Sequence, residues 1–191
     1  YSSALVYFKK LQTVAQTTEN SNIARLGILR CSYFLNNQTE TINIATEIIN
    51  DPKSSEAVRT EAKLNRAKAR VQQNKLTDAL KDLKEIVIDT RTSFGAEAKF
   101  TLADVLFKLN RLNEAETEVL DFAKKGTPYQ YWLASSFIVL ADVYIQKGDD
   151  FQAKQYLLSL QKNYTTNDDI QPKIIQRLNE IENRSKVKVV K

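Results

Sequence analysis

The side chains that carry out most enzymatic and metal chemistry are nearly absent from this chain of 191 residues. It contains no histidine and a single cysteine, Cys31. Without imidazole there is no histidine general base, no Ser-His-Asp triad and no histidine metal ligand. One thiol forms neither an internal disulfide nor a cysteine-based zinc site. Cys31 stands between Leu29 and Phe34 in an apolar stretch, so we expect it to be a small buried residue on a helix.

Acidic residues are more numerous, but their spacing does not define a reactive site. Asp149 and Asp150 are adjacent carboxylates that lack the further oxygen ligands of an EF-hand calcium loop. Their position before a periodic segment favours a helix N-cap instead. A glycosidase needs two carboxylates across a cleft, one of them desolvated, and nothing marks out such a pair among the 23 acidic residues. We therefore expect a protein that is not an enzyme and that uses neither a metal nor a cofactor.

A group of aromatic residues is a candidate for ligand binding without catalysis. Tyr129, Tyr131 and Trp132 stand at the start of an expected helix. One interpretation is a stacking platform for a peptide or glycan. The other is that these rings pack a long helix onto the helix pair that precedes it. We favour packing and keep the platform as the alternative.

The net charge of +5 comes mostly from the C-terminus. The last eight residues contain no acidic residue and four basic ones, namely Arg184, Lys186, Lys188 and Lys191. Without them, residues 1–183 carry a net charge of +1. A broad basic face that binds phosphates is therefore not expected, and neither is a nucleic-acid partner. Nucleic-acid binding through the tail is a third functional hypothesis, which salt-dependent binding would support.

No segment of the sequence has the character of a membrane span or a signal peptide. The longest unbroken apolar runs are five residues, at Ala4–Phe8 and Phe137–Ala141, whereas a spanning helix needs about 20. We expect no membrane span. The chain starts at Tyr1 rather than at methionine, which predicts a processed protein or a cut fragment.

Helical periodicity identifies the elements that must position any binding surface. Only seven residues are glycine or proline, too few for the frequent turns of an all-β fold. Apolar residues recur at helical spacing, as at Ala98, Leu102 and Val105. Ten helices are predicted, at about 2–16, 21–35, 39–50, 55–73, 76–89, 95–109, 112–125, 128–147, 150–163 and 168–183. The basic segment 184–191 has no apolar stripe and is predicted to be disordered.

The predicted helices pair off, and the pairs recur. The segments that share one helix–turn–helix layout are 22–50, 60–89, 96–125 and 134–163. A small or apolar residue on the first helix returns at intervals of 38, 36 and 38 residues, as Leu29, Ala67, Ala103 and Ala141. The turns hold Asn36, Asn74, Asn110 and Gly148, residues that tolerate a left-handed backbone at a helix end. Thr41 departs from the pattern in the first copy, and Arg66 and Arg70 depart from it in the second.

This layout resembles the tetratricopeptide repeat family. The best copies are Ala96–Gly126 and Ala134–Tyr164, and the resemblance covers residues 1–164. It implies an all-α fold, a right-handed superhelix of helical hairpins over residues 1–183. Residues 1–16 are then the second helix of a preceding repeat, and residues 168–183 form a C-terminal capping helix.

Three short stretches of the sequence suggest a closer resemblance. The stretches Gly126–Pro128, Gln130–Ala134 and Gly148–Lys154 are similar to those of long tetratricopeptide proteins of Bacteroidetes-type bacteria. Those proteins are similar to periplasmic repeat proteins associated with the Tol–Pal system and with outer-membrane assembly. The resemblance implies the C-terminal part of a longer chain, with upstream repeats of the same chain as neighbours. It also implies a periplasmic or outer-membrane-associated location, with the cytoplasm as the alternative.

A stack of helical hairpins binds other chains because its geometry builds a concave groove. In the family, the first helix of each hairpin lines that groove. The resemblance places thirteen residues there: Leu26, Arg30, Tyr33, Phe34, Leu64, Lys68, Phe100, Asp104, Phe107, Lys108, Ile138, Asp142 and Ile145. For each one, packing between helices is the competing interpretation.

The groove residues lead to a functional expectation. The Lys, Arg and Asn clamp by which some family members hold a C-terminal carboxylate is missing, because apolar residues such as Leu26 and Phe100 stand in its place. We expect a non-catalytic scaffold that binds a peptide or helix of a partner protein in cell-envelope assembly. The alternative is a structural spacer in a longer envelope protein, with no binding of its own.

Two sets of residues test which face of each helix is predicted to be buried. Phe100 and Phe107 are expected in the groove, so that changing both to serine weakens binding and spares the fold, whereas Leu102 faces neighbouring helices. Helix 2–16 is apolar nearly all round, unlike its counterparts in the repeats. We expect an upstream helix to cover Leu5, Val6 and Tyr7, and the fragment to self-associate or bind a hydrophobic dye without it.

Overall fold

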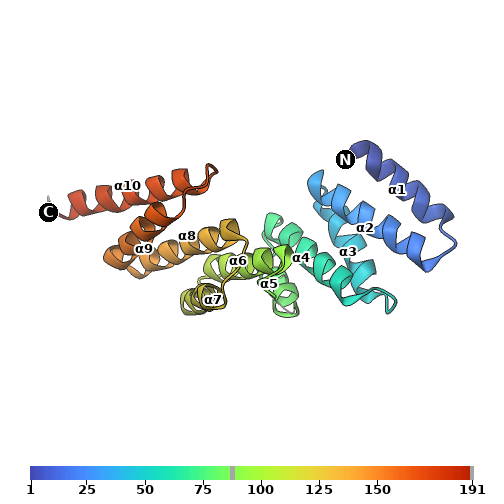
Figure 1. Cartoon of the computed structure of the whole chain (residues 1–191), viewed down its shortest axis with the longest axis horizontal. Coiled ribbons are helices and arrows are strands. Elements are labelled where there is room, and N and C mark those ends of the chain that lie inside the picture. Colours follow the sequence, from blue (N-terminus) through green and yellow to red (C-terminus); the bar gives the residue numbers. More distant parts are fainter. Residues whose placement is uncertain (87–88, 190–191) are drawn as a thin grey trace. The chain divides into compact units, whose positions relative to one another are not determined.

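The computed structural model describes residues 1–86 and 89–189, which form ten α-helices and no strand. The helices are α1 (Ser2–Val14), α2 (Thr18–Phe34), α3 (Gln38–Asn50), α4 (Glu56–Gln72), α5 (Leu76–Lys84), α6 (Ser93–Lys108), α7 (Leu112–Lys125), α8 (Gln130–Lys147), α9 (Asp150–Asn163) and α10 (Ile170–Val189). Figure 1 shows them in chain order. The predicted all-α fold of consecutive helix pairs is confirmed.

The chain divides into two compact units, Tyr1–Val87 and Ile88–Lys191. In the first, each of the helices α1 to α4 packs on the helix that follows it, and α2 also contacts α4. In the second, α6 packs on both α7 and α8, while α10 packs on both α8 and α9. A first helix therefore touches its own hairpin partner and the first helix of the following pair. This contact pattern brings residues of alternate helices onto one face within each unit.

Each unit has apolar clusters where the helical stripes meet. In the first unit, Ile28 and Leu29 of α2 pack with Ile44 and Ile48 of α3, and all four are at most 5% exposed. In the second unit, one cluster joins α6, α7 and α8, and another joins α8, α9 and α10. Burying one large aliphatic side chain contributes about 1.5–3 kcal/mol, so these stripes hold the hairpins together. Cys31 is buried, as expected.

The turns inside the hairpins adopt the predicted left-handed backbone. The φ angles are 54° at Asn36, 59° at Asn74, 59° at Asn110 and 82° at Gly148. These values reverse the chain within three residues, and the following N–H groups bond back to carbonyls of the preceding helix, as Asn37 does to Ser32 at 2.9 Å. The Asp149 carboxylate accepts the Gln152 N–H at 2.9 Å. This confirms the N-cap interpretation of the Asp149-Asp150 pair.

The C-terminal segment differs from the sequence expectation. The helix predicted to end at residue 183 continues to Val189, so α10 is longer than the predicted capping helix. Disorder of the tail in the isolated protein stays a prediction, and residues 190–191 lie outside the described part. No glycine or proline interrupts this segment, and extending an existing helix costs little. Lys186 pairs with Glu182 at 2.8 Å, and the Ser185 hydroxyl donates to the Glu182 carbonyl at 2.7 Å.

Candidate binding groove

The predicted groove residues of the second unit converge on one pocket. It has a volume of about 140 Å³ and lies among three alternate helices, α6, α8 and α10. The residues that line it are Phe100, Asp104, Ser135, Ile138, Val139, Asp142, Lys173 and Arg177. Four of the seven groove residues predicted in this unit, Phe100, Asp104, Ile138 and Asp142, are therefore brought together. We call this the α6–α8–α10 pocket.

Charged groups border the α6–α8–α10 pocket in pairs. The Arg177 guanidinium donates to both carboxylate oxygens of Asp142, at 2.6 and 2.7 Å, and so joins α10 to α8. Asp104 pairs with Lys108 one turn along α6, at 2.6 Å. Lys173 pairs with Asp169 at 2.6 Å. Two carboxylates and two cations therefore line the pocket together with the apolar side chains of Phe100, Ile138 and Val139.

Three other predicted groove residues of this unit lie beside the pocket or in the packing. Lys108 is exposed and holds Asp104. Phe107 packs against the buried cluster of α6, α7 and α8, and Ile145 packs against the cluster of α8, α9 and α10. Phe100 also contacts the first of these clusters. Because both phenylalanines support a core, the expectation that their double serine variant spares the fold does not follow from this structure.

The aromatic residues at the start of α8 contribute to packing. The Trp132 ring stacks on Phe100 of α6 with centroids 5.5 Å apart, and Tyr131 meets Trp132 edge-on at 5.0 Å. The Tyr131 hydroxyl lies 3.4 Å from an Asp169 oxygen, and burial raises the pKa of that phenol. These contacts agree with the packing interpretation, because the stacked pair joins α8 to α6.

In the first unit several predicted groove residues contact other side chains of the same unit. Arg30 donates to both carboxylate oxygens of Glu61 on α4, at 2.6 and 2.8 Å, which raises the pKa of its guanidinium. The Lys68 ammonium lies 4.2 Å from the centre of the Tyr33 ring. Phe34 stacks on Tyr1 at 4.5 Å. The pairs occupy the first-helix face of this unit.

One predicted groove residue is misplaced. Leu64 is 1% exposed and belongs to the core of the first unit, so its assignment to a groove was wrong. Its repeat equivalent Ile138 is 5% exposed and yet lines the α6–α8–α10 pocket. Because both residues occupy the same position in the repeat, the side chains around them decide whether a pocket remains.

The N-terminal helix borders an apolar cavity that two predicted groove residues, Leu26 and Arg30, help to line. A space of about 420 Å³ lies between α1 and α2, lined mainly by Tyr1, Ala4, Phe8, Ile23 and Leu26, with Gly27, Arg30 and Cys31 completing it. Phe8 lies so close to Gly27 that an added Cβ would stand 2.4 Å from the ring. The cavity lies between side chains of α1 and α2 that the sequence assigns only to a face of their own helix.

The expectation for an uncovered α1 has a mixed outcome. Val6 and Tyr7 are 54% and 70% exposed, as expected of an uncovered apolar face. Leu5 is half-buried and instead packs against the core formed by α2 and α3. Self-association or dye binding through this helix stays a prediction.

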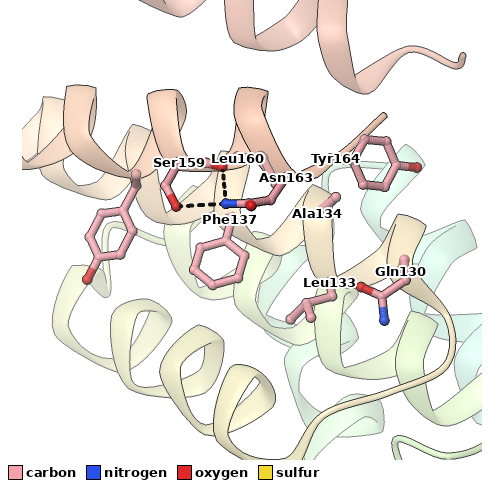
Figure 2. Close-up of a pocket in the computed structure, with 9 residues that line it drawn as sticks. Gln130, Leu133, Ala134, Phe137, Ser159, Leu160, Asn163 and Tyr164 are labelled. Carbon is pink, nitrogen blue, oxygen red and sulfur yellow. Dashed lines mark hydrogen bonds between the residues drawn. The ribbon is translucent and has the colours of Figure 1, made fainter. Parts of the chain in front are cut away.

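A second pocket in the last hairpin contains none of the predicted groove residues. It has a volume of about 200 Å³, and nine residues line it: Gln130, Leu133, Ala134, Phe137, Tyr156, Ser159, Leu160, Asn163 and Tyr164. Figure 2 shows them drawn from α8, α9 and the segment that follows. The Asn163 amide donates to the Ser159 carbonyl at 2.8 Å and to its hydroxyl at 3.4 Å. The lining is mostly apolar, and the pocket offers no charged group.

Sequence reasoning missed four members of the α6–α8–α10 pocket. Ser135 and Val139 stand outside the repeat positions from which the groove residues are predicted. Lys173 and Arg177 were missed because α10 was taken as a cap, although it presents its side chains to the pocket as a further first helix does. The usable signal is the spacing on α10, where Lys173 and Arg177 stand one turn apart and each directly precedes an apolar residue, Ile174 or Leu178.

Comparison with known proteins adds no family to this picture: no protein-family model matches the chain, and no curated protein matches its sequence. Within the described residues, no cluster of three or more side chains is suited to hold a metal ion. The same part of the chain contains no helix that is both long and apolar enough to cross a bilayer.

Proposed function

We propose that this chain is a non-catalytic interaction module that binds a peptide or helix of another protein on its first-helix face. The observation that carries the proposal is the α6–α8–α10 pocket. Three helices that alternate along the chain build it, and four residues expected in a groove line it, including Phe100 and Asp104.

The composition of the pocket suits a protein ligand. Protein interfaces combine a desolvated apolar centre with polar groups at the rim, and a few anchors placed in pockets supply most of the binding free energy. Phe100, Ile138 and Val139 provide the apolar part, while the carboxylates of Asp104 and Asp142 provide polar contacts. A volume of about 140 Å³ fits one side chain rather than a cofactor.

The cellular setting belongs to the same proposal. The resemblance to long repeat proteins of the bacterial envelope favours a role in cell-envelope assembly, in a periplasmic or outer-membrane-associated protein. In that setting further repeats of the same chain would extend the first-helix face, and the partner would be another envelope protein.

A site-specific crosslinking experiment tests the proposal. A photo-crosslinking amino acid replaces Lys108, which is exposed at the edge of the pocket, or Lys154, which is exposed on α9 as a matched control. In the full-length protein irradiated in its native cells, we expect a discrete crosslinked product from position 108 and none from position 154. Equal products from both positions would contradict a groove-specific partner.

The alternative of a structural spacer gives a different result in the same experiment. The paired side chains of the first unit, such as Arg30 with Glu61, favour this alternative because their charged groups already have partners within the unit. A spacer predicts no crosslinked partner from position 108 or from position 154.

A further inference from the structure

The first helices of both units are joined by similar ion pairs. In the first unit, Arg30 of α2 holds Glu61 of α4, and in the second unit Asp142 of α8 holds Arg177 of α10. Both pairs are bidentate, with distances between 2.6 and 2.8 Å. Arg30 and Asp142 are equivalent in the repeat. We call such a pair between successive first helices a rung.

The partner of Arg30 in the first-unit rung also has a defined position in the repeat. Glu61 precedes Lys68, the equivalent of Arg30 on its own helix, by seven residues. The rung of the first unit therefore joins this repeat position on α2 to the residue seven places before the same position on α4. The same seven-residue spacing indicates which residue of α8 would pair with the equivalent position on α6.

Between α6 and α8 the rung is incomplete. Asp104 is the equivalent of Arg30 and Asp142, and the residue seven places before Asp142 is Ser135. Both line the α6–α8–α10 pocket. The serine side chain, however, is too short to pair with the Asp104 carboxylate as Arg177 pairs with Asp142. Ser135 is 4% exposed, so it forms part of the wall. The pocket occupies the place where the longer side chain of a complete rung would lie.

Asp104 uses a partner that is easily displaced. It pairs within its own helix with Lys108, whose side chain is 44% exposed, whereas the Asp104 side chain is 22% exposed. Pairs of this spacing on a helix surface stabilise the folded state only weakly. A second cation that approached Asp104 from the pocket would replace a weak contact with a more shielded one.

The other charged groups in the pocket favour a basic ligand over an acidic one. Arg177 is already held by both oxygens of Asp142 and donates to the Lys173 carbonyl at 3.3 Å. Lys173 pairs with Asp169, and its side chain is 41% exposed, about twice as much as that of Asp104. An incoming anion would therefore meet either the well-solvated Lys173 or Arg177, which is already paired with Asp142. An incoming cation would meet the less exposed carboxylate of Asp104.

We propose that the α6–α8–α10 pocket accepts a lysine or arginine side chain of the partner, which completes the rung by pairing with Asp104. The aliphatic part of that side chain lies over Phe100, Ile138 and Val139, and its charged end takes the place of Lys108. This inference rests on the proposed function, because it names the chemistry that a peptide would present to the groove.

Short peptides test the inference directly. The probes are acetyl-Gly-Arg-Gly-amide, the matched citrulline peptide, which is neutral, and the glutamate peptide. Titrated into the isotope-labelled protein, the arginine peptide is expected to shift the NMR signals of Ser135, Ile138 and Val139 in a saturable way. The other two peptides are expected to leave these signals in place. Equal binding of the citrulline peptide, binding of the glutamate peptide, or no saturable shift with arginine would overturn the proposal.

Three variants sharpen the test. Asp104→Asn keeps the shape of the side chain and is expected to weaken arginine-peptide binding about tenfold or more, as loss of a charge-assisted contact does. Lys108→Gln removes the competing cation and is expected to strengthen binding about twofold. The control Asp78→Asn removes an exposed carboxylate on α5 and is expected to change nothing. Unchanged affinity in Asp104→Asn would sink the idea.

A gain-of-contact variant supplies the missing group from within. Ser135→Arg places a guanidinium at the rung position, so we expect a higher melting temperature and loss of arginine-peptide binding. If this variant does not fold, Ser135→Lys is the smaller replacement, and the Asp104→Asn titration decides independently. Crosslinking from position 108 to a partner segment without basic residues would refute the inference while leaving the proposed function intact.

Discussion

The α4–α5 and α8–α9 hairpins place opposite kinds of side chain at equivalent repeat positions. In α4–α5, Arg66 and Arg70 converge on Asp82: Arg66 donates to both carboxylate oxygens at 2.6 and 3.0 Å, and Arg70 donates to one of them at 2.6 Å. The equivalents in α8–α9 are Leu140, Tyr144 and Tyr156. There the Tyr144 and Tyr156 rings stack at 5.5 Å, and Phe137 packs on Tyr156 at 6.0 Å.

The difference shows that the hairpin needs complementary side chains rather than one chemistry. Arg66 and Arg70 stand where the repeat has apolar residues. The facing position on α5 is correspondingly acidic, since it holds Asp82, which is 2% exposed. Removing one member of the charged set destabilises the fold strongly, because it leaves a buried charge without its partner. The aromatic set loses contacts gradually, because dispersion and area terms sum over many atoms.

The largest predicted effect comes from removing the shared carboxylate. Asp82→Ala leaves two guanidinium groups partly buried without their acceptor, and we expect a loss of about 3–5 kcal/mol in the free energy of unfolding. Urea denaturation of the variant measures it. The control Asp78→Ala removes an exposed carboxylate of the same helix, whose pair with Lys81 is 3.5 Å long, and should cost less than about 1 kcal/mol. Similar losses in both variants would mean that the burial of Asp82 does not matter.

The next prediction transfers one set of side chains to the other hairpin. The triple variant Arg66→Leu, Arg70→Tyr and Asp82→Tyr introduces the α8–α9 residues into α4–α5. Because well-packed apolar replacements of buried ion pairs are often neutral or stabilising by about 1–4 kcal/mol, we expect urea stability no lower than that of the original chain. A triple variant as unstable as Asp82→Ala would show that the two hairpins are not interchangeable.

A smaller effect separates stacking from hydrogen bonding in α8. The Tyr144 hydroxyl donates to Glu116 of α7 at 2.6 Å, and the resulting preference for the neutral phenol raises the pKa of Tyr144. Tyr144→Phe keeps the ring on Tyr156 and loses this bond, so thermal unfolding should show a loss of about 1 kcal/mol. Tyr144→Ala is the harsher control, since it removes the stacked ring as well. A loss in Tyr144→Phe equal to that in Tyr144→Ala would mean that stacking contributes nothing.

The smallest predicted effect is a dependence on acid. Hydrogen bonds from Lys147 and Tyr144 lower the pKa of Glu116, and those from Lys125 and Lys99 lower the pKa of Asp121. A carboxylate with a lowered pKa stabilises the folded state above its unfolded-state pKa, and this contribution is lost as pH falls through the folded value. We therefore expect the melting temperature to decline below about pH 4.5, and less steeply in Glu116→Gln. A melting temperature that does not decline between pH 5 and about pH 2 would contradict these pairings.

The sequence alone determined the local structure because that structure depends on neighbouring residues. Apolar spacing at three and four residues located all ten helices, and asparagine or glycine at each hairpin turn predicted the left-handed backbone that Asn36 and Gly148 adopt. The absence of histidine and the single Cys31 removed whole classes of chemistry before any fold was known.

Only the tertiary structure decided which first-helix side chains border an opening. Leu64 and Ile138 share one register position, yet the first lies in the core and the second lines a pocket. The outcome depends on residues far away in the chain: Arg177 reaches Asp142 from α10, whereas Ser135 cannot reach Asp104. Periodicity assigns a side chain to a face of its helix. Whether that face meets a neighbour is set by the length and charge of side chains on other helices, which no local pattern contains.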